Sequence, residues 1–293
     1  MLKYEMPLYR PPSEGNNLII QATIGCSFNR CTFCSMYREK SYRARELDSV
    51  LSDIDKGAAW WPEASRVFLA DGDALALPTE HLIQILTHLA RRFPRLTRVS
   101  CYALPANLLN KSVAELALLR ANRLSLIYYG IESGYAPLLK RIRKGASPAA
   151  MVEGLLKAHE AQIKVSATVV LGLGGKELWQ EHIEGTVALL HQVPLHYLST
   201  LQLHLEESVQ ADFLARFDPP FEFQDDEAVL AEQYRLIDTL TTPPKRLIFR
   251  SNHASNALAL AGNLPKDRLR LLAEIDAARQ QESGLRPEWL RSL

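Results

Sequence analysis

The sequence alternates along most of its length between short apolar runs and segments in which apolar residues recur every three or four positions. The runs predict buried strands, and the periodic segments predict helices that pack one face against a sheet. Six such units follow one another without an Asn-Gly turn between the runs, which favours parallel strands joined by right-handed crossovers. We therefore predict an α/β fold: a partial (β/α)6 barrel, similar to a TIM barrel, with parallel strands and a short C-terminal extension.

The same pattern predicts where the elements lie. Ser112 with Glu115 forms a capping-box pattern, and Ser147-Pro148 is typical of a helix start. We expect strands at 18–23, 66–70, 98–102, 124–130, 165–171 and 197–205, an apolar run at 246–250, and late helices near 226–240 and 266–280. The predicted domains are an N-terminal extension, a core and a C-terminal extension that closes the barrel mouth, at residues 1–16, 17–240 and 241–293.

Charge and hydropathy argue against two classes of partner. The 293 residues include 34 Lys and Arg against 33 Asp and Glu, so no excess of positive charge indicates nucleic-acid binding. No apolar run is long enough to predict a transmembrane helix, and the N-terminal segment lacks the pattern of a secretory signal. We therefore expect a cytoplasmic protein with no membrane partner.

Three of the four cysteines fall within nine residues, directly after the first predicted strand. Cys26, Cys31 and Cys34 form a Cys-x4-Cys-x2-Cys pattern, and three thiolates on one loop can hold three irons of a 4Fe–4S cluster, which leaves the fourth iron open. A closed zinc site needs four protein ligands, and the first histidine is His81. Zinc and ordinary core cysteines remain as alternatives. We expect Cys101, within the third strand, to be a small buried residue.

This cysteine pattern resembles that of the radical S-adenosylmethionine (SAM) superfamily, whose members carry a cysteine triplet after the first strand of a six-unit partial barrel. The commonest family spacing is Cys-x3-Cys-x2-Cys, and the present spacing is one residue longer. The resemblance implies that Cys26, Cys31 and Cys34 bind one 4Fe–4S cluster and that SAM is the second cofactor. It also places Phe33 in the aromatic position that lies against the cofactor; a hydrophobic plug beneath the loop is the alternative.

Residues after the second and third strands extend the resemblance. Asp71, Gly72 and Asp73 occupy the place of the family's Gly-Gly-Glu segment, whose backbone receives the amino group of SAM. An ordinary polar turn is the alternative for this segment. Tyr102 aligns with a SAM-contacting position in members similar to coproporphyrinogen dehydrogenase. The resemblance therefore implies that these four residues bind the cofactor.

The fourth and fifth strands carry further landmarks. Residues 130–134 read Gly-Ile-Glu-Ser-Gly and are followed by Lys144-Gly145, which resembles a signature of cobalamin-type and coproporphyrinogen-oxidase-like radical SAM proteins. The resemblance implies that Glu132 contacts SAM and that Lys144 approaches the SAM carboxylate; a solvated charge is the alternative for the lysine. Residues 172–177, after the fifth strand, resemble the family's Gly-x-x-Gly-x-Glu turn, with Val170 and Leu171 as apolar neighbours of the adenine. The resemblance thus implies that Leu171 and Gly172 bind the cofactor.

The resemblance implies a radical SAM enzyme, an oxidoreductase or transferase with an unknown substrate. Such an enzyme reductively cleaves SAM at the cluster to give a 5′-deoxyadenosyl radical, which abstracts a hydrogen atom from the substrate. A low-potential electron donor such as flavodoxin or ferredoxin is implied as the partner. The cysteines are surrounded in the sequence by arginines, which suit an anionic substrate or an acidic electron donor, or else form a solvated rim: Arg30, Arg38, Arg43 and Arg45. The alternative function is a non-catalytic iron–sulfur or zinc binding module.

The C-terminal segment offers candidate substrate ligands. Hydrogen-bonding side chains are concentrated directly after the last apolar run, where a barrel mouth would meet a polar substrate. The candidates are Asn252, His253, Ser255 and Asn256. The alternative is that Ser251 caps a helix formed by the sequence ASNALALAG.

Overall fold

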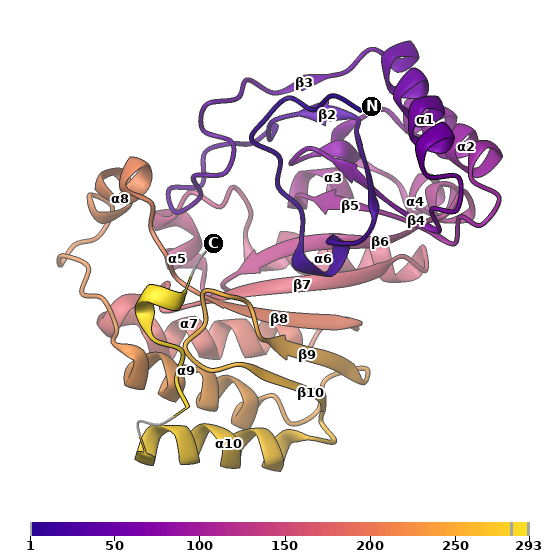
Figure 1. The fold of residues 1–293 in the computed structure, drawn as a ribbon. Coiled ribbons are helices and arrows are strands. Elements are labelled where there is room, and N and C mark those ends of the chain that lie inside the picture. The colour runs from indigo at the N-terminus through magenta and orange to yellow at the C-terminus, as the bar shows by residue number, and fades with distance from the viewer. Residues whose placement is uncertain (1, 282–283, 292–293) are drawn as a thin grey trace. The chain divides into compact units, whose positions relative to one another are not determined.

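The computed structural model describes residues 2–281 and 284–291, and its chain falls into two compact units. The first unit contains Met1–Asn29, Cys34–Tyr129 and Gly154–Val165, and the second contains Arg30–Phe33, Gly130–Glu153 and Ser166–Leu293. Figure 1 shows the elements of both units. Because the strands and helices of each unit have their own packing, the units are described one at a time.

The first unit is built on parallel strands in the order β1-β4-β5-β6. Leu18 of β1 lies opposite Val67 of β4, and Val67 lies opposite Val99 of β5. All four residues of β1 and four of the five in β4 are buried, as expected for parallel strands covered on both faces. The strand bounds are β1 Leu18–Gln21, β4 Arg66–Ala70, β5 Arg98–Ala103 and β6 Leu124–Glu132, with the antiparallel pair β2 Thr23–Ile24 and β3 Arg43–Ala44 beside them.

Helices of the first unit bury one apolar face each. Val50 and Ile54 of α1 are buried, and α1 lies beside α2 (Figure 1). Ser112 and Glu115 form the predicted capping box at the start of α4. The bounds are η1 Pro12–Glu14, α1 Leu47–Trp60, η2 Ala74–Ala76, α2 Thr79–Arg92, α3 Pro105–Asn110, α4 Val113–Ala121 and, in part, α6 Pro148–Glu160.

The second unit continues the same architecture with one change of direction. Strands β7, β8 and β9 are parallel, and β10 pairs antiparallel with β9. Helices α7, α9 and α10 lie on one face of these strands (Figure 1). The strands are β7 Lys164–Leu171, β8 Tyr197–Gln202, β9 Leu247–Ser251 and β10 Leu260–Leu264; the helices are α5 Ala136–Arg141, α7 Gly175–Leu190, α8 Glu207–Leu214, α9 Asp226–Thr239, α10 Arg268–Gln281 and η3 Glu288–Leu290.

The predicted α/β class with parallel strands is confirmed by these elements. One alternative was wrong: the segment after Ser251 contains no helix, and its end forms strand β10. Leu260 and Leu264 are buried while Ala261 and Asn263 are exposed, so this segment has the period of two that a half-buried strand requires. The short helices α3, α5 and α8 were missed. The predicted domain division at residues 16 and 240 stays a prediction. Within the described residues, no helix is both long and apolar enough to cross a membrane.

A contact between two glycines fastens helix α7 to the turn after β6. A Cβ atom added at Gly134 would lie 2.2 Å from the carbonyl oxygen of Gly185, and one added at Gly185 would lie 2.8 Å from the carbonyl oxygen of Gly134. Both clashes are with backbone, so a side chain could fit only if the helix or the turn moved. The Gly134 amide also donates to Thr186 Oγ1 at 2.9 Å.

We predict that Gly134→Ala lowers the free energy of unfolding by about 1–3 kcal/mol, because the added methyl group overpacks a contact between backbones. Denaturant unfolding measures this difference. Gly57→Ala is the control, since a Cβ there would meet the flexible Leu18 side chain at 3.3 Å and alanine favours a helix interior. Equal stability of Gly134→Ala and wild type would show that the turn is not held by α7.

Candidate active site

The cysteine loop, residues 26–34, begins one residue after β2 ends, with Gly25 between them. Cys26, Cys31 and Cys34 are each partly exposed, with Cys26 and Cys34 in the first unit and Cys31 in the second. Among the described residues, no three Cys, His, Asp or Glu side chains gather as the ligands of a single metal ion would. A 4Fe–4S cluster binds its cysteines through different irons, so its ligands need not converge on one atom. Three accessible thiols on one loop fit that donor set.

Side chains of the first unit fix the backbone of the cysteine loop. Asn29 donates through Nδ2 to the carbonyl oxygen of Tyr37 at 2.6 Å. Arg38 donates through Nε to the carbonyl oxygen of Cys34 at 2.9 Å. The backbone around the last cysteine is therefore held by polar contacts with the chain that follows it.

A buried ion pair connects the two ends of the cysteine loop. Lys40 Nζ lies 2.7 Å from Asp71 Oδ2, and the exposed fractions of the two side chains are 5% and 0%. Asp71 Oδ2 also accepts from the Gly25 amide at 3.2 Å, directly before the loop. Lys40 Nζ donates in addition to the carbonyl oxygens of Glu5 and Pro7, at 2.7 and 2.6 Å. The pair thus holds the residue before the loop, the chain after it and the N-terminal segment at one point.

Asp73 lies in the same unit and is fully buried. Burial raises the pKa of its carboxyl to about 6, although hydrogen bonds, including one from Ser27 Oγ, act in the opposite direction. Burial is also the main cause that raises the pKa of Tyr42 to about 12, followed by the charges of Asp73 and Cys26. Asp71 and Asp73 thus lie beside the start of the cysteine loop. Their predicted contacts with SAM stay predictions.

Aromatic rings pack together on the inner strands of the first unit. The ring of Tyr102 lies 5.3 Å from that of Phe68 and 6.2 Å from that of Tyr128, each in an edge-to-face arrangement. Burial raises the pKa of Tyr102, with further contributions from Tyr128 and from Cys34. Tyr102 is therefore a protonated, uncharged side chain near the end of the cysteine loop.

Cys101 has the buried position that its strand predicts. Its exposed fraction is 1%, and burial raises the pKa of its thiol well above the ordinary value. A protonated thiol in the core is a poor nucleophile and a poor metal ligand. Cys101 is therefore a suitable internal control for the three loop cysteines.

In the second unit, the structure brings Glu132 and Lys144 together. Lys144 Nζ donates to Glu132 Oε1 at 2.9 Å, and both residues are buried. A Cβ atom added at Gly130 would lie 1.9 Å from Glu132 Oε1 and 2.9 Å from Lys144 Nζ, so the pair occupies space that a glycine leaves open. The solvated lysine considered above is wrong for Lys144. Their contacts with SAM stay predictions.

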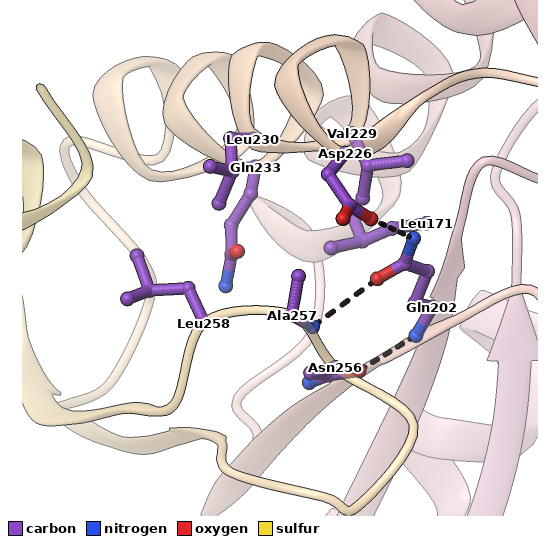
Figure 2. Close-up of a pocket in the computed structure, with 9 residues that line it drawn as sticks. All are labelled: Leu171, Gln202, Asp226, Val229, Leu230, Gln233, Asn256, Ala257 and Leu258. Atoms are coloured by element: carbon purple, nitrogen blue, oxygen red, sulfur yellow. Dashed lines mark hydrogen bonds between the residues drawn. The ribbon is translucent and has the colours of Figure 1, made fainter. Parts of the chain in front are cut away.

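Leu171 borders a small cavity between the ends of β7 and β8 and helix α9, which Figure 2 shows. Gln202 crosses this region: its Nε2 donates to Asp226 Oδ1 at 3.1 Å, and its Oε1 accepts from the Ala257 amide at 3.3 Å. The Gly172 amide, one residue beyond Leu171, is not open to a ligand here, because it donates to a buried carboxylate at 3.0 Å.

Asn256 joins strands in this structure, and its predicted contact with substrate stays a prediction. It is 3% exposed; its Oδ1 accepts from the Gln202 amide at 2.7 Å (Figure 2), and its Nδ2 donates to Thr200 O and Ser251 Oγ, both at 2.8 Å. These bonds use the donors and acceptors of the amide within the fold. A ligand that bound Asn256 would have to replace them.

The other residues of that segment differ in exposure. Asn252 is exposed, and His253 is half-buried. His253 Nδ1 lies 2.9 Å from Ser255 Oγ, and Ser255 is buried. Burial, followed by the charge of Arg286, lowers the pKa of His253, so its ring is neutral at pH 7. Asn252 and His253 are the members of this set that a substrate could reach most directly.

The sequence did not reveal the roles of Lys40, His182 and Glu232, nor that of the Gln202 side chain. Each acts through a partner on a different element: Lys40 with Asp71, Gln202 with Asp226, and His182 with Glu232. No local spacing carries such pairings. The only signal was position, because Gln202 ends a parallel strand, where functional groups gather in α/β barrels.

A family model described as the Radical SAM superfamily matches residues 20–190, more than half of the chain. The chain belongs to the radical SAM superfamily. The superfamily implies SAM-dependent radical chemistry, with a 4Fe–4S cluster and SAM as cofactors. No curated protein matches the chain.

Solved structures with a similar fold include other radical SAM enzymes. Coproporphyrinogen III oxidase (HemN) from Escherichia coli aligns with a TM-score of 0.58 and 15% identity over 77% of this chain and 52% of that one. Methylornithine synthase (PylB) aligns with a TM-score of 0.56 and 12% identity, over 92% of this chain and 74% of that one. The cobalamin-dependent enzyme OxsB, with aqua-cobalamin bound, aligns with a TM-score of 0.50 and 18% identity, over 61% of this chain and 27% of that one. The chain thus spans about half of the oxidase and about a quarter of OxsB, and these likenesses concern the fold.

We predict that Lys40→Met lowers the free energy of unfolding by about 3–5 kcal/mol, because it leaves the Asp71 carboxylate buried without its cation. Denaturant unfolding measures this loss. Arg43→Met is the matched control: Arg43 pairs with Glu5 at the surface, so the change should cost less than about 1 kcal/mol. The double variant Lys40→Met/Asp71→Leu should recover part of the loss. Equal effects of K40M and R43M would contradict the importance of the buried pair.

We predict that the contribution of Asp73 to the free energy of unfolding depends on pH. Its pKa is raised in the folded state to about 6 from 3.8, so this contribution is complete below about pH 4 and is lost as the pH rises through about 6. The stability of Asp73→Asn relative to wild type should therefore increase by about 2–3 kcal/mol between pH 4 and pH 7. Unfolding free energies across this range, with exposed Asp48→Asn as control, measure the change. A pH-independent difference between D73N and wild type would refute the raised pKa.

Proposed function

We propose that this chain is a radical SAM enzyme that binds one 4Fe–4S cluster through Cys26, Cys31 and Cys34 and cleaves SAM reductively. The observation that carries the proposal is the cysteine loop placed after the first strands of a radical SAM fold and tied at both ends by Lys40 and Asp71. When bound, the reduced cluster supplies the electron that cleaves SAM, and the 5′-deoxyadenosyl radical so formed takes a hydrogen atom from the substrate.

In this proposal the residues of the chain bind the cluster and hold the cysteine loop in position. The three loop thiolates hold the cluster, and the buried Lys40–Asp71 pair keeps the backbone on either side of them in place. A fixed loop matters because the environment of a cluster, including hydrogen bonds and solvent exposure, sets its reduction potential.

Glu132 and Lys144 supply opposite charges for two parts of SAM. An ammonium group suits the methionyl carboxylate, and a carboxylate suits the ribose hydroxyls. In the absence of SAM each neutralises the other at 2.9 Å, so neither charge is left buried alone. Binding would replace one charge-assisted contact by two.

Aromatic side chains pack together on strands of the first unit. Phe68 is fully buried, and the rings of Tyr102 and Tyr128 pack against it edge to face. Packed rings limit the access of water, and limited access of water protects a reactive radical from side reactions with solvent.

A low-potential electron donor is the proposed protein partner. Among the arginines near the cysteines, Arg43 pairs with Glu5 and Arg45 pairs with Asp53 at 2.8 Å, whereas Arg30 is exposed. Arg30 is therefore the residue of this group that we assign to an acidic donor surface.

We predict that the anaerobically reconstituted protein releases 5′-deoxyadenosine when dithionite and SAM are added, because the three thiolates leave one iron for SAM. Liquid chromatography of the reaction measures 5′-deoxyadenosine, and iron and sulfide analysis of the protein measures the bound cluster. Replacing all three loop cysteines by alanine should abolish cluster binding and product.

Cys101→Ala is the matched control and should keep the cluster and the product, since Cys101 is buried in β5. A cluster-loaded wild type that forms no 5′-deoxyadenosine would contradict the proposed function. A cluster whose EPR spectrum is insensitive to SAM would favour the non-catalytic binding module.

A further inference from the structure

Two titratable side chains of the second unit are fully buried and have no part in the function proposed above. His182 lies on α7 and Glu232 on α9, and His182 Nε2 is 3.3 Å from Glu232 Oε1. The two helices lie side by side (Figure 1). Burying a carboxylate is costly unless hydrogen bonds compensate, so this pair needs a reason to be there.

On one side, the pair reaches the turn after β6. His182 Nδ1 lies 2.8 Å from Ser133 Oγ, and Ser133 directly follows Glu132. Ser133 Oγ also accepts from the Tyr135 amide at 3.0 Å. The serine hydroxyl therefore has its hydrogen available for His182 Nδ1, which fixes the orientation of the turn that presents Glu132.

On the other side, the pair reaches the end of β7. Glu232 Oε1 accepts from the Gly172 amide at 3.0 Å, and His182 Nε2 lies 3.1 Å from the carbonyl oxygen of Val170. With Nδ1 accepting from Ser133, Nε2 carries the ring hydrogen and donates toward the carboxylate and this carbonyl. One neutral tautomer of the histidine thus satisfies the contacts on both sides.

We propose that His182 and Glu232 are positioning residues that hold the turn of Glu132 and the turn of Leu171 and Gly172 in a fixed mutual arrangement for SAM. This proposal rests on the proposed function, in which Glu132 binds SAM, and on the predicted contact of Leu171 and Gly172 with the same cofactor. Each turn alone could adopt other conformations, because its backbone groups have alternative partners in water. The buried pair excludes those conformations, since moving either turn would leave a buried polar group without a partner.

Three variants separate the contributions of the pair. His182→Leu removes both ring contacts, His182→Gln keeps a donor near the place of Nε2, and Glu232→Gln keeps an oxygen for the Gly172 amide. Glu184→Gln is the matched control, because Glu184 and Arg235 join the same two helices at the surface.

We expect two readouts to change together. The dissociation constant of SAM, measured by calorimetry on the cluster-loaded protein well below its melting temperature, should rise about 10- to 100-fold in His182→Leu and less in His182→Gln and Glu232→Gln. Hydrogen–deuterium exchange without SAM should rise at both turns, residues 130–136 and 170–176, in His182→Leu. E184Q should behave as wild type in both measurements.

A lower melting temperature with an unchanged dissociation constant would overturn the proposal, because the pair would then be structural only. Faster exchange at one turn alone would also overturn it. If wild-type protein fails to bind SAM while H182L loosens both turns, the proposed function fails and the coupling of the turns stands. If wild type binds SAM and H182L binds it equally well, the positioning role fails and the proposed function stands.

Discussion

The Lys40–Asp71 ion pair is the contact on which the candidate site depends. Nine residues of the cysteine loop lie between short strands and form no regular element of their own apart from turns. Their arrangement is imposed from outside, by a buried carboxylate at the end of β4 that accepts from the Gly25 amide and from Lys40. The carboxylate tolerates burial because the ammonium group neutralises it, and the ammonium group has two carbonyl oxygens besides.

The end of a sheet strand therefore fixes the start of the loop, in addition to the contacts of Asn29 and Arg38. Asp71 comes directly after β4, and β4 pairs in parallel with β1, which leads toward the cysteines. In the second unit the same logic applies to Glu132 at the end of β6 and to Gly172 just after β7. Asp71, Glu132 and Gly172 each lie where a strand ends, which is the place where α/β barrels present functional groups.

Local sequence patterns predicted the elements better than the pairs between them. The strand predicted at 66–70 has the observed bounds of β4, and the capping box of Ser112 and Glu115 is present, because both depend on near neighbours in the chain. Strand β10 was missed because its period of two covers only five residues and includes a glycine. Asp71 was identified as a site residue, but its buried cation Lys40 was not, since 31 positions separate them.

The candidate site shows the same division. The sequence pattern identified Glu132 and Lys144 as separate candidates. In the structure they form one buried ion pair. Asn256 was chosen for its chemistry, yet its amide is used to fasten β8 to the segment after β9. Hydrogen-bonding capacity can be recognised in a sequence, but whether it is already used depends on partners that the fold supplies.

The contact of Gly134 with Gly185 has a consequence for how this region can change over evolution. Where side chains meet, a core adapts to substitutions by small rotamer adjustments and exchanges of volume. At Gly134 and Gly185 backbone contacts backbone, so side-chain adjustments cannot make room. A larger residue at either glycine would require a shift of helix α7 or of the turn. We therefore expect sequence drift to be slow at this junction and faster in the surrounding helix surface.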